Sequence, residues 1–204
     1  MSDLIYRYVP GRRPETLLLL HGTGGNETDL LALGEAMLPG AGLLSPRGPV
    51  LENGMPRFFK RFAQGVFDFE DVKRRAAELG EFVREKAEEY GFDAGRVLAM
   101  GYSNGANIAA AMLLTGAAAF PRAVLVRAMV PVDGSHPEAL PDLAGTEVLL
   151  AAGRYDPIAT PAQTRSLGEL LKSAGATVTE HTESSGHEMT RGDIEAAARW
   201  LARK

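Results

Sequence analysis

A serine stands between two glycines in Gly101-Tyr102-Ser103-Asn104-Gly105, directly after the apolar residues 97–100. A serine hydroxyl is a poor nucleophile unless a sharp turn presents it to a base. Glycine at both outer positions leaves room where a Cβ would clash with a neighbouring strand or helix. An apolar run, a turn and then small residues of helical potential make the context that a nucleophile elbow requires. An ordinary loop closed by glycines fits these five residues equally well. The choice between a nucleophile elbow and such a loop therefore depends on the rest of the chain.

An acid and a base follow Ser103 in the chain, each after a further apolar segment. Asp156 lies in the turn Gly153-Arg154-Tyr155-Asp156-Pro157, and His187 follows the segment 177–182. The order Ser, Asp, His is that of the triad of α/β-hydrolases. In such a triad His187 takes the proton of Ser103 as the oxygen attacks a carbonyl carbon, and Asp156 holds the imidazole in the right tautomer.

Other side chains compete for both roles. Asp133 also follows a predicted strand, and the residues alone leave it open beside Asp156, whose Gly-x-x-Asp-Pro turn fixes its direction. His136 lies in a Gly/Ser/Pro loop and looks solvated, and His181 falls within a predicted strand. The histidines do not pair at a metal-ligand spacing seen on helices, so no metal site is expected.

The stretch His21-Gly22-Thr23-Gly24-Gly25 follows the apolar run at 16–20. We expect the oxyanion hole to consist of the backbone N–H groups of Thr23 and Asn104, because glycines let bare backbone approach a substrate. His21 competes for the role of base, or it braces this loop through hydrogen bonds. A nucleotide site is disfavoured because neither Gly-x-Gly-x-x-Gly nor a Walker loop is present.

Apolar runs alternate with amphipathic segments along the whole chain. This alternation predicts one α/β domain over residues 1–204, with a mainly parallel sheet of about six strands and helices on both faces. The predicted strands are 16–20, 42–45, the run before Ser103, 123–130, 147–152 and 177–182, and the predicted helices are 30–37, 70–90, 104–114, 161–173 and 190–203. Ligands of open α/β sheets bind outside the carboxyl ends of the strands, where the candidate residues fall.

Residues 46–69 are the least regular stretch, and their five phenylalanines argue against disorder. We expect a folded excursion over one side of the molecule. Phe58 and Phe59, together with His21 and Gly22, are candidates for the substrate pocket, although a core role for the aromatic residues is favoured. The basic residues Arg57, Lys60 and Arg61 could steer an anionic substrate, but a solvated surface is favoured for them.

Composition excludes several classes of function. The net charge of −4 disfavours a nucleic-acid partner, which usually leaves a basic footprint. The absence of cysteine excludes disulfides, a thiol nucleophile and zinc–thiolate sites. The N-terminus lacks the order of a signal peptide, and no apolar run approaches the ~20 residues of a membrane span. We therefore expect a cytoplasmic protein that acts on a small molecule, without a membrane partner.

Taken together, these motifs resemble the phospholipase/carboxylesterase branch of the α/β-hydrolases, and in particular its small bacterial members. The resemblance covers nearly the whole chain and rests on residues 20–27, 47–68, 101–107, 153–158, 186–187 and 200–201. It implies a Ser103–Asp156–His187 triad, and so favours Asp156 over Asp133. It also implies ester hydrolysis without a cofactor, an α/β-hydrolase fold without a large cap domain, and a monomer or homodimer. The polar residues 132–136 depart from the family pattern, which leaves the shape of that pocket wall open.

The sequence thus predicts a serine carboxylesterase that hydrolyses small carboxylic esters through an acyl-enzyme intermediate. A thioesterase or a lysophospholipase would use the same triad, so the triad does not separate these activities. A non-catalytic binding protein on a hydrolase scaffold is a third hypothesis, disfavoured by the intact triad.

Overall fold

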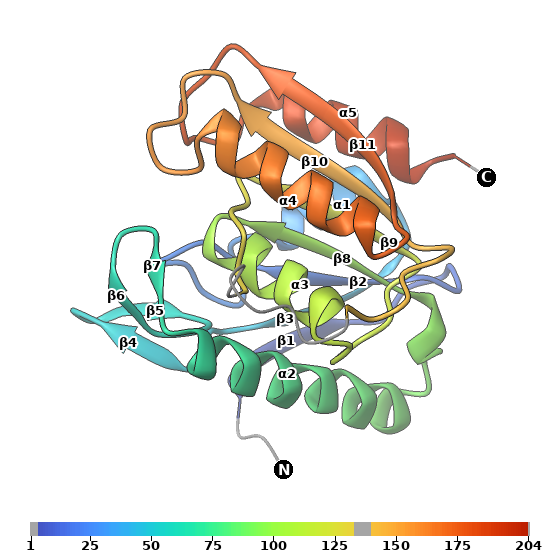
Figure 1. The fold of residues 1–204 in the computed structure, drawn as a ribbon. Coiled ribbons are helices and arrows are strands. Elements are labelled where there is room, and N and C mark those ends of the chain that lie inside the picture. The colour runs from blue at the N-terminus through green and yellow to red at the C-terminus, as the bar shows by residue number, and fades with distance from the viewer. Residues whose placement is uncertain (1–3, 133–139, 204) are drawn as a thin grey trace.

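A twisted, mostly parallel sheet forms the centre of the molecule in the computed structural model, which describes residues 4–132 and 140–203 (Figure 1). Among these residues the sheet has seven strands in the order β1-β3-β2-β8-β9-β10-β11. All neighbouring pairs are parallel except β1 and β3, which pair antiparallel at one edge. The strands are β1 (Tyr6–Val9), β2 (Thr16–Leu20), β3 (Gly42–Pro46), β8 (Val97–Tyr102), β9 (Arg122–Val126), β10 (Glu147–Gly153) and β11 (Thr177–Glu183).

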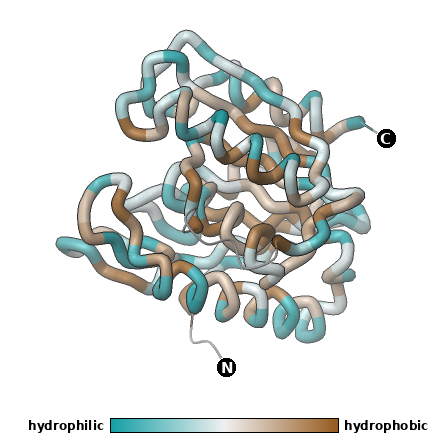
Figure 2. Tube along the Cα trace, in the orientation of Figure 1, coloured by the Kyte–Doolittle hydropathy of each residue, from teal (hydrophilic) through white to brown (hydrophobic). Residues whose placement is uncertain are grey.

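Helices cover both faces of this sheet. In Figure 1, α2 (Phe69–Tyr90), α3 (Asn104–Leu114) and α4 (Pro161–Ser173) lie in front, and α1 (Leu31–Met37) and α5 (Arg191–Leu201) lie behind. Successive residues of a strand point to opposite faces. Accordingly Leu18 and Leu20 join the core under α2, α3 and α4, while Leu17 and Leu19 join the core under α1 and α5. Figure 2 shows hydrophobic and hydrophilic residues alternating along α2, as expected of a helix buried on one side.

The predicted α/β-hydrolase fold is confirmed, and the central sheet differs from the prediction at β1 and at the end of β9. β1 was missed, because its side chains alternate between half-buried and exposed at the sheet edge and give no apolar run. β9 ends at Val126 rather than at residue 130, because the next residue, Arg127, has a left-handed backbone with φ of 58°.

The excursion forms two small antiparallel hairpins: β4 (Val50–Glu52) with β5 (Met55–Arg57), and β6 (Arg61–Ala63) with β7 (Val66–Phe67). Asn53 and Gly54 join the first pair with φ of 51° and 79°, which suits the tight turn that this dipeptide favours. A short 3₁₀ turn, η1 (Ala94–Arg96), precedes β8. Both hairpins lie at the left of Figure 1, the side toward which β8, β10 and β11 point.

Within the part of the chain that the structure describes, no helix is both long and apolar enough to cross a bilayer.

Candidate active site

Ser103 occupies a strained turn between β8 and α3. Its φ of 52° and ψ of −113° lie in a region that side-chain-bearing residues rarely adopt. A Cβ on Gly105 would lie 1.9 Å from the carbonyl oxygen of Leu20, and one on Gly101 would lie 2.4 Å from the carbonyl oxygen of Gly105. Both glycines are therefore required for the close approach of strand, turn and helix, as the sequence predicted.

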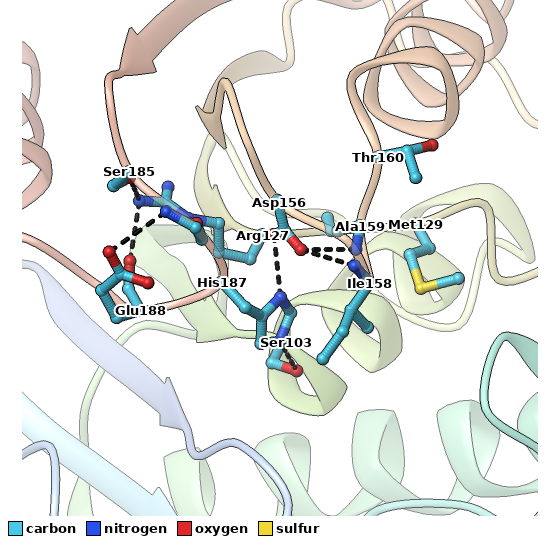
Figure 3. Close-up of polar contacts among 12 residues, drawn as sticks. Ser103, Arg127, Met129, Asp156, Ile158, Ala159, Thr160, Ser185, His187 and Glu188 are labelled. Atoms are coloured by element: carbon cyan, nitrogen blue, oxygen red, sulfur yellow. Dashed lines mark hydrogen bonds and ion pairs between the residues drawn. The ribbon is translucent and has the colours of Figure 1, made fainter.

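A continuous chain of hydrogen bonds joins Ser103, His187 and Asp156 (Figure 3). The Ser103 Oγ lies 2.8 Å from His187 Nε2, and His187 Nδ1 lies 2.8 Å from Asp156 Oδ2. Asp156 is buried, and its other oxygen accepts from the backbone N–H groups of Ile158 and Ala159. The carboxylate is thus fixed in direction and can only accept from Nδ1, which leaves Nε2 as the acceptor for the serine hydroxyl.

The rival residues lie elsewhere or outside the described residues. His181 lies in β11, where its Nε2 is 2.8 Å from Glu183 Oε1. Asp133 and His136, like most of the polar stretch 132–136, fall outside the residues that the structure describes.

His21 acts as a brace rather than as a partner of Ser103. Its buried ring donates from Nδ1 to the carbonyl oxygen of Gly22 over 2.6 Å, and its Nε2 accepts from the N–H of Gly48 over 2.9 Å. Burial lowers the pKa of His21, which favours the neutral imidazole that this pair of bonds requires. The ring therefore ties the loop after β2 to the start of the excursion.

Of the two predicted oxyanion donors, Thr23 lies in the loop after β2, and Asn104 is the first residue of α3, directly after Ser103. Among the described residues, the hydrogen bonds leave the backbone N–H groups of Thr23 and Asn104 without an acceptor. The loop carrying Thr23 is fixed on both sides, because the N–H of Gly24 donates to Pro56 and a Cβ on Gly22 would lie 2.9 Å from the Tyr102 ring. An N–H held rigidly without a partner is what oxyanion stabilisation needs.

The excursion contributes a buried cation behind this loop. The Arg57 Nη1 donates to Thr23 Oγ1 over 2.7 Å and lies 3.5 Å from Glu52 Oε2. Burial lowers the pKa of Arg57 to about 10, with the nearby Arg61 guanidinium acting in the same direction. The expectation of a solvated Arg57 is thus wrong, whereas Lys60 is exposed.

The aromatic residues of the excursion divide into two sets. Phe58 and Phe59 are 2% and 0% exposed and pack in the core, which is the role that the sequence favoured for them over lining a substrate pocket. Phe62, in contrast, is 76% exposed. The backbone of Phe58 still supports the site, since its N–H donates to the Asn104 Oδ1 over 2.7 Å.

Sequence reasoning missed Arg127. Its side chain is wholly buried beside the His187 loop and pairs with Asp193. A single arginine within the apolar segment predicted as 123–130 was the available signal. Asp193 does cap α5, since it accepts from the N–H of Thr190, but it also carries the charge that balances Arg127.

Comparison with known proteins agrees with this fold and identifies the family. A sequence profile of the Phospholipase/Carboxylesterase family matches residues 10–203. MhqD of Bacillus subtilis (strain 168), named as a hydrolase, is 48% identical over 193 residues, which make up 95% of each chain. The carboxylesterase of Bacillus cereus has a TM-score of 0.93 at 49% identity, covering 98% of this chain and 93% of its own. The carboxylesterase of Mesorhizobium loti has a TM-score of 0.92 at 31% identity, covering 100% and 98%. The chain therefore belongs to the phospholipase/carboxylesterase family and is a carboxylic ester hydrolase.

Proposed function

We propose that this enzyme hydrolyses small carboxylic esters with Ser103 as nucleophile, His187 as general base and acid, and Asp156 as the group that orients the imidazole. The observation that carries the proposal is the unbroken chain of two 2.8 Å hydrogen bonds from Ser103 through His187 to a buried carboxylate. Such an arrangement activates a hydroxyl that is otherwise a weak nucleophile.

In the first half of the reaction, Ser103 Oγ attacks the acyl carbon and its proton passes to His187 Nε2. The tetrahedral intermediate collapses, the alcohol leaves with that proton, and the acyl group stays on Ser103. Water then attacks the acyl-enzyme, with His187 taking the water proton and returning it to Ser103 as the acid leaves. Asp156 stabilises the imidazolium in both halves.

The negative oxygen of each tetrahedral intermediate is placed against the backbone N–H groups of Thr23 and Asn104. Their rigid supports favour this role, because donors that need no reorganisation contribute most to such a transition state. Arg57, hydrogen-bonded to Thr23, adds positive charge behind the loop.

Replacing the nucleophile tests the proposal. Ser103→Ala should abolish turnover of p-nitrophenyl acetate and labelling by a fluorophosphonate probe, because among the described residues no other hydroxyl is hydrogen-bonded to the imidazole of His187. Ser173→Ala is the matched control, since Ser173 is an exposed residue on α4 that bonds only to the carbonyl of Leu170. Normal hydrolysis by Ser103→Ala would rule out this serine as the nucleophile.

The acyl chain length of the preferred substrate separates a small-ester hydrolase from a lysophospholipase, and a comparison of esters with thioesters separates it from a thioesterase. The exposed apolar side chains Leu51, Phe62 and Val66 on the excursion are the observation that favours a longer acyl chain. We expect kcat/KM on p-nitrophenyl esters to be highest for short acyl groups and low for the matched thioesters. A maximum at long acyl chains, or a preference for thioesters, would assign the enzyme to one of the alternatives.

A further inference from the structure

Arg127 combines two unusual properties one residue beyond the end of β9. Its backbone has a left-handed φ of 58°, which costs free energy for any residue other than glycine. Its guanidinium is completely buried, where a charge must be paired and hydrogen-bonded. A strand can end without either property. The hydrogen-bond partners of the guanidinium therefore indicate what Arg127 does.

The guanidinium of Arg127 is bonded to both sides of His187 (Figure 3). Nε donates to the carbonyl of Gly186 over 3.1 Å, and Nη2 donates to the carbonyl of Glu188 over 2.8 Å and to the hydroxyl of Ser185 over 3.0 Å. Three residues next to His187 in the chain, Ser185, Gly186 and Glu188, are therefore held by a single rigid planar group.

Tyr102 holds the carbonyl of His187. Its hydroxyl donates to the carbonyl oxygen of His187 itself over 3.0 Å, so the carbonyls of Gly186, His187 and Glu188 all accept from side chains. Tyr102 directly precedes Ser103. The strand that presents the nucleophile and the strand beside it thus also fix the loop of the base.

Asp193 balances the charge of Arg127 and links it to α5. Its two carboxylate oxygens lie 3.1 and 2.7 Å from Arg127 Nη1 and Nη2, and neither side chain is exposed. The carboxylate also accepts from the N–H and the hydroxyl of Thr190 at the start of α5. A buried pair of this kind adds little stability compared with well-packed apolar residues, so stability alone does not account for it.

We propose that Arg127, seated on Asp193 and assisted by Tyr102, is a positioning residue that sets the place of His187 between Ser103 and Asp156. This inference rests on the proposed function of the three residues. Because a misplacement of about 1 Å can lower turnover about 10²-fold, a clamp on the backbone of the base acts on kcat rather than on substrate binding.

The decisive variant is Arg127→Met/Asp193→Asn, which removes both charges and so avoids leaving one buried and unpaired. We expect kcat for p-nitrophenyl acetate to fall about 10²-fold while KM changes less than about threefold. Arg127→Lys keeps the charge but not the planar fork, and should recover about tenfold of that loss. Tyr102→Phe removes one hydrogen bond and should lower kcat about fivefold.

A spectroscopic readout separates positioning from a general loss of structure. The proton between His187 Nδ1 and Asp156 should give a resolved downfield resonance in the proton NMR spectrum of the wild type. We expect this resonance to broaden or vanish in Arg127→Met/Asp193→Asn, and to return in Arg127→Lys. Arg122→Met is the matched control, because Arg122 lies at the opposite end of β9 and bonds to the carbonyls of Leu201 and Arg203. It should leave both kcat and the resonance unchanged.

The outcomes distinguish this proposal from the proposed function. Inactive Ser103→Ala together with wild-type kcat and an intact resonance in Arg127→Met/Asp193→Asn would overturn the positioning role alone. Full activity of Ser103→Ala would overturn both. If Arg122→Met lowered kcat as much as the double variant, the loss would be a structural effect of replacing an arginine at either end of β9, and the positioning role would also be overturned.

Discussion

Two regions approach Ser103 from different sides, and they are built in different ways. The loop of His187 is held by a buried ion pair, Arg127 with Asp193, whose side chains are both 0% exposed. The excursion of two hairpins touches the site through Arg57 and the backbone of Phe58, but carries Phe62 at 76% exposure. In the first region, buried polar contacts fix the position of His187. The second region presents apolar side chains to solvent.

The difference indicates a division of tasks. Chemistry at Ser103 tolerates little displacement, so the groups that hold the base are buried and fully bonded. Discrimination among esters depends on the shape and apolarity of the adjoining surface, which can change at exposed positions with little effect on stability. We therefore expect substitutions on the base side to lower kcat strongly, and substitutions on the excursion to act more moderately.

The largest effect should come from Asp156→Asn. An amide that keeps the bonds to Ile158 and Ala159 would turn its NH₂ toward His187 Nδ1, which favours the wrong tautomer. We expect kcat to fall about 10³–10⁴-fold at pH 7, measured on p-nitrophenyl acetate.

Two aspartates serve as comparisons for Asp156. Asp142→Asn changes an exposed carboxylate that bonds to the N–H of Ala144, and should retain wild-type kcat. Asp133→Asn should also remain active. If Asp133→Asn were inactive and Asp156→Asn active, the acid of the site would be Asp133.

An intermediate effect is expected on the excursion side. Arg57→Met removes the hydrogen bond to Thr23 Oγ1 and the charge behind the oxyanion loop, but leaves the backbone donors in place. We expect kcat to fall about 10-fold, less than the ~10²–10³-fold cost of removing an oxyanion donor outright. Arg61→Met is the control. Its kcat, measured by steady-state kinetics, should change by less than about threefold, since Arg61 binds Glu52 at the protein surface. If kcat fell equally in Arg57→Met and Arg61→Met, Arg57 would act only through its ion pair with Glu52, to which Arg61 also binds.

The smallest effect concerns pH and His21, which ties the loop after β2 to the start of the excursion. Burial lowers the pKa of His21 below its ordinary value of 6.5, so the unfolded chain binds this proton more readily than the native protein. The stability due to neutral His21 is fully present above pH 6.5 and is lost as the pH falls through the lowered native pKa.

Urea unfolding at pH 7.5 and 5.5 measures this dependence. Wild type should lose more unfolding free energy on acidification than His21→Gln, which has no proton to take up in this range. Ser173→Ala is the control, because it changes an exposed hydroxyl and no titratable group, and it should retain the wild-type pH dependence. An equal loss in wild type and His21→Gln would show that His21 does not carry the effect.

Local patterns explain which parts of the fold could be predicted. Leu17 to Leu20 form a fully buried run that indicates a parallel strand, and Gly91 ends α2 with a φ of 72° where the sequence placed the stop. β1 and the hairpins were not predicted as strands, because their half-exposed residues follow the sheet edge and the surface rather than an apolar pattern.

The residues of the candidate site likewise divide into those that a local pattern predicts and those that depend on distant segments. Gly101, Gly105 and Ser103 form a local motif, and their close packing follows from the absence of a Cβ at the two glycines. Asp156 and His187 could be proposed because each follows a strand and the carboxyl ends of parallel strands meet at one edge. Arg127 could not be assigned a role, since its partners beside His187 and on α5 lie 58 to 66 residues away.

The sequence by itself determined the elbow, the alternation of strands and helices, and the residue types that follow each strand, because these depend on neighbours in the chain. The tertiary structure decided which of several histidines faces Ser103, that Arg57 and Arg127 are buried, and that Phe59 is core while Phe62 is exposed. Burial and charge pairing arise only when distant segments meet, and one sequence read along its length carries no record of those distances.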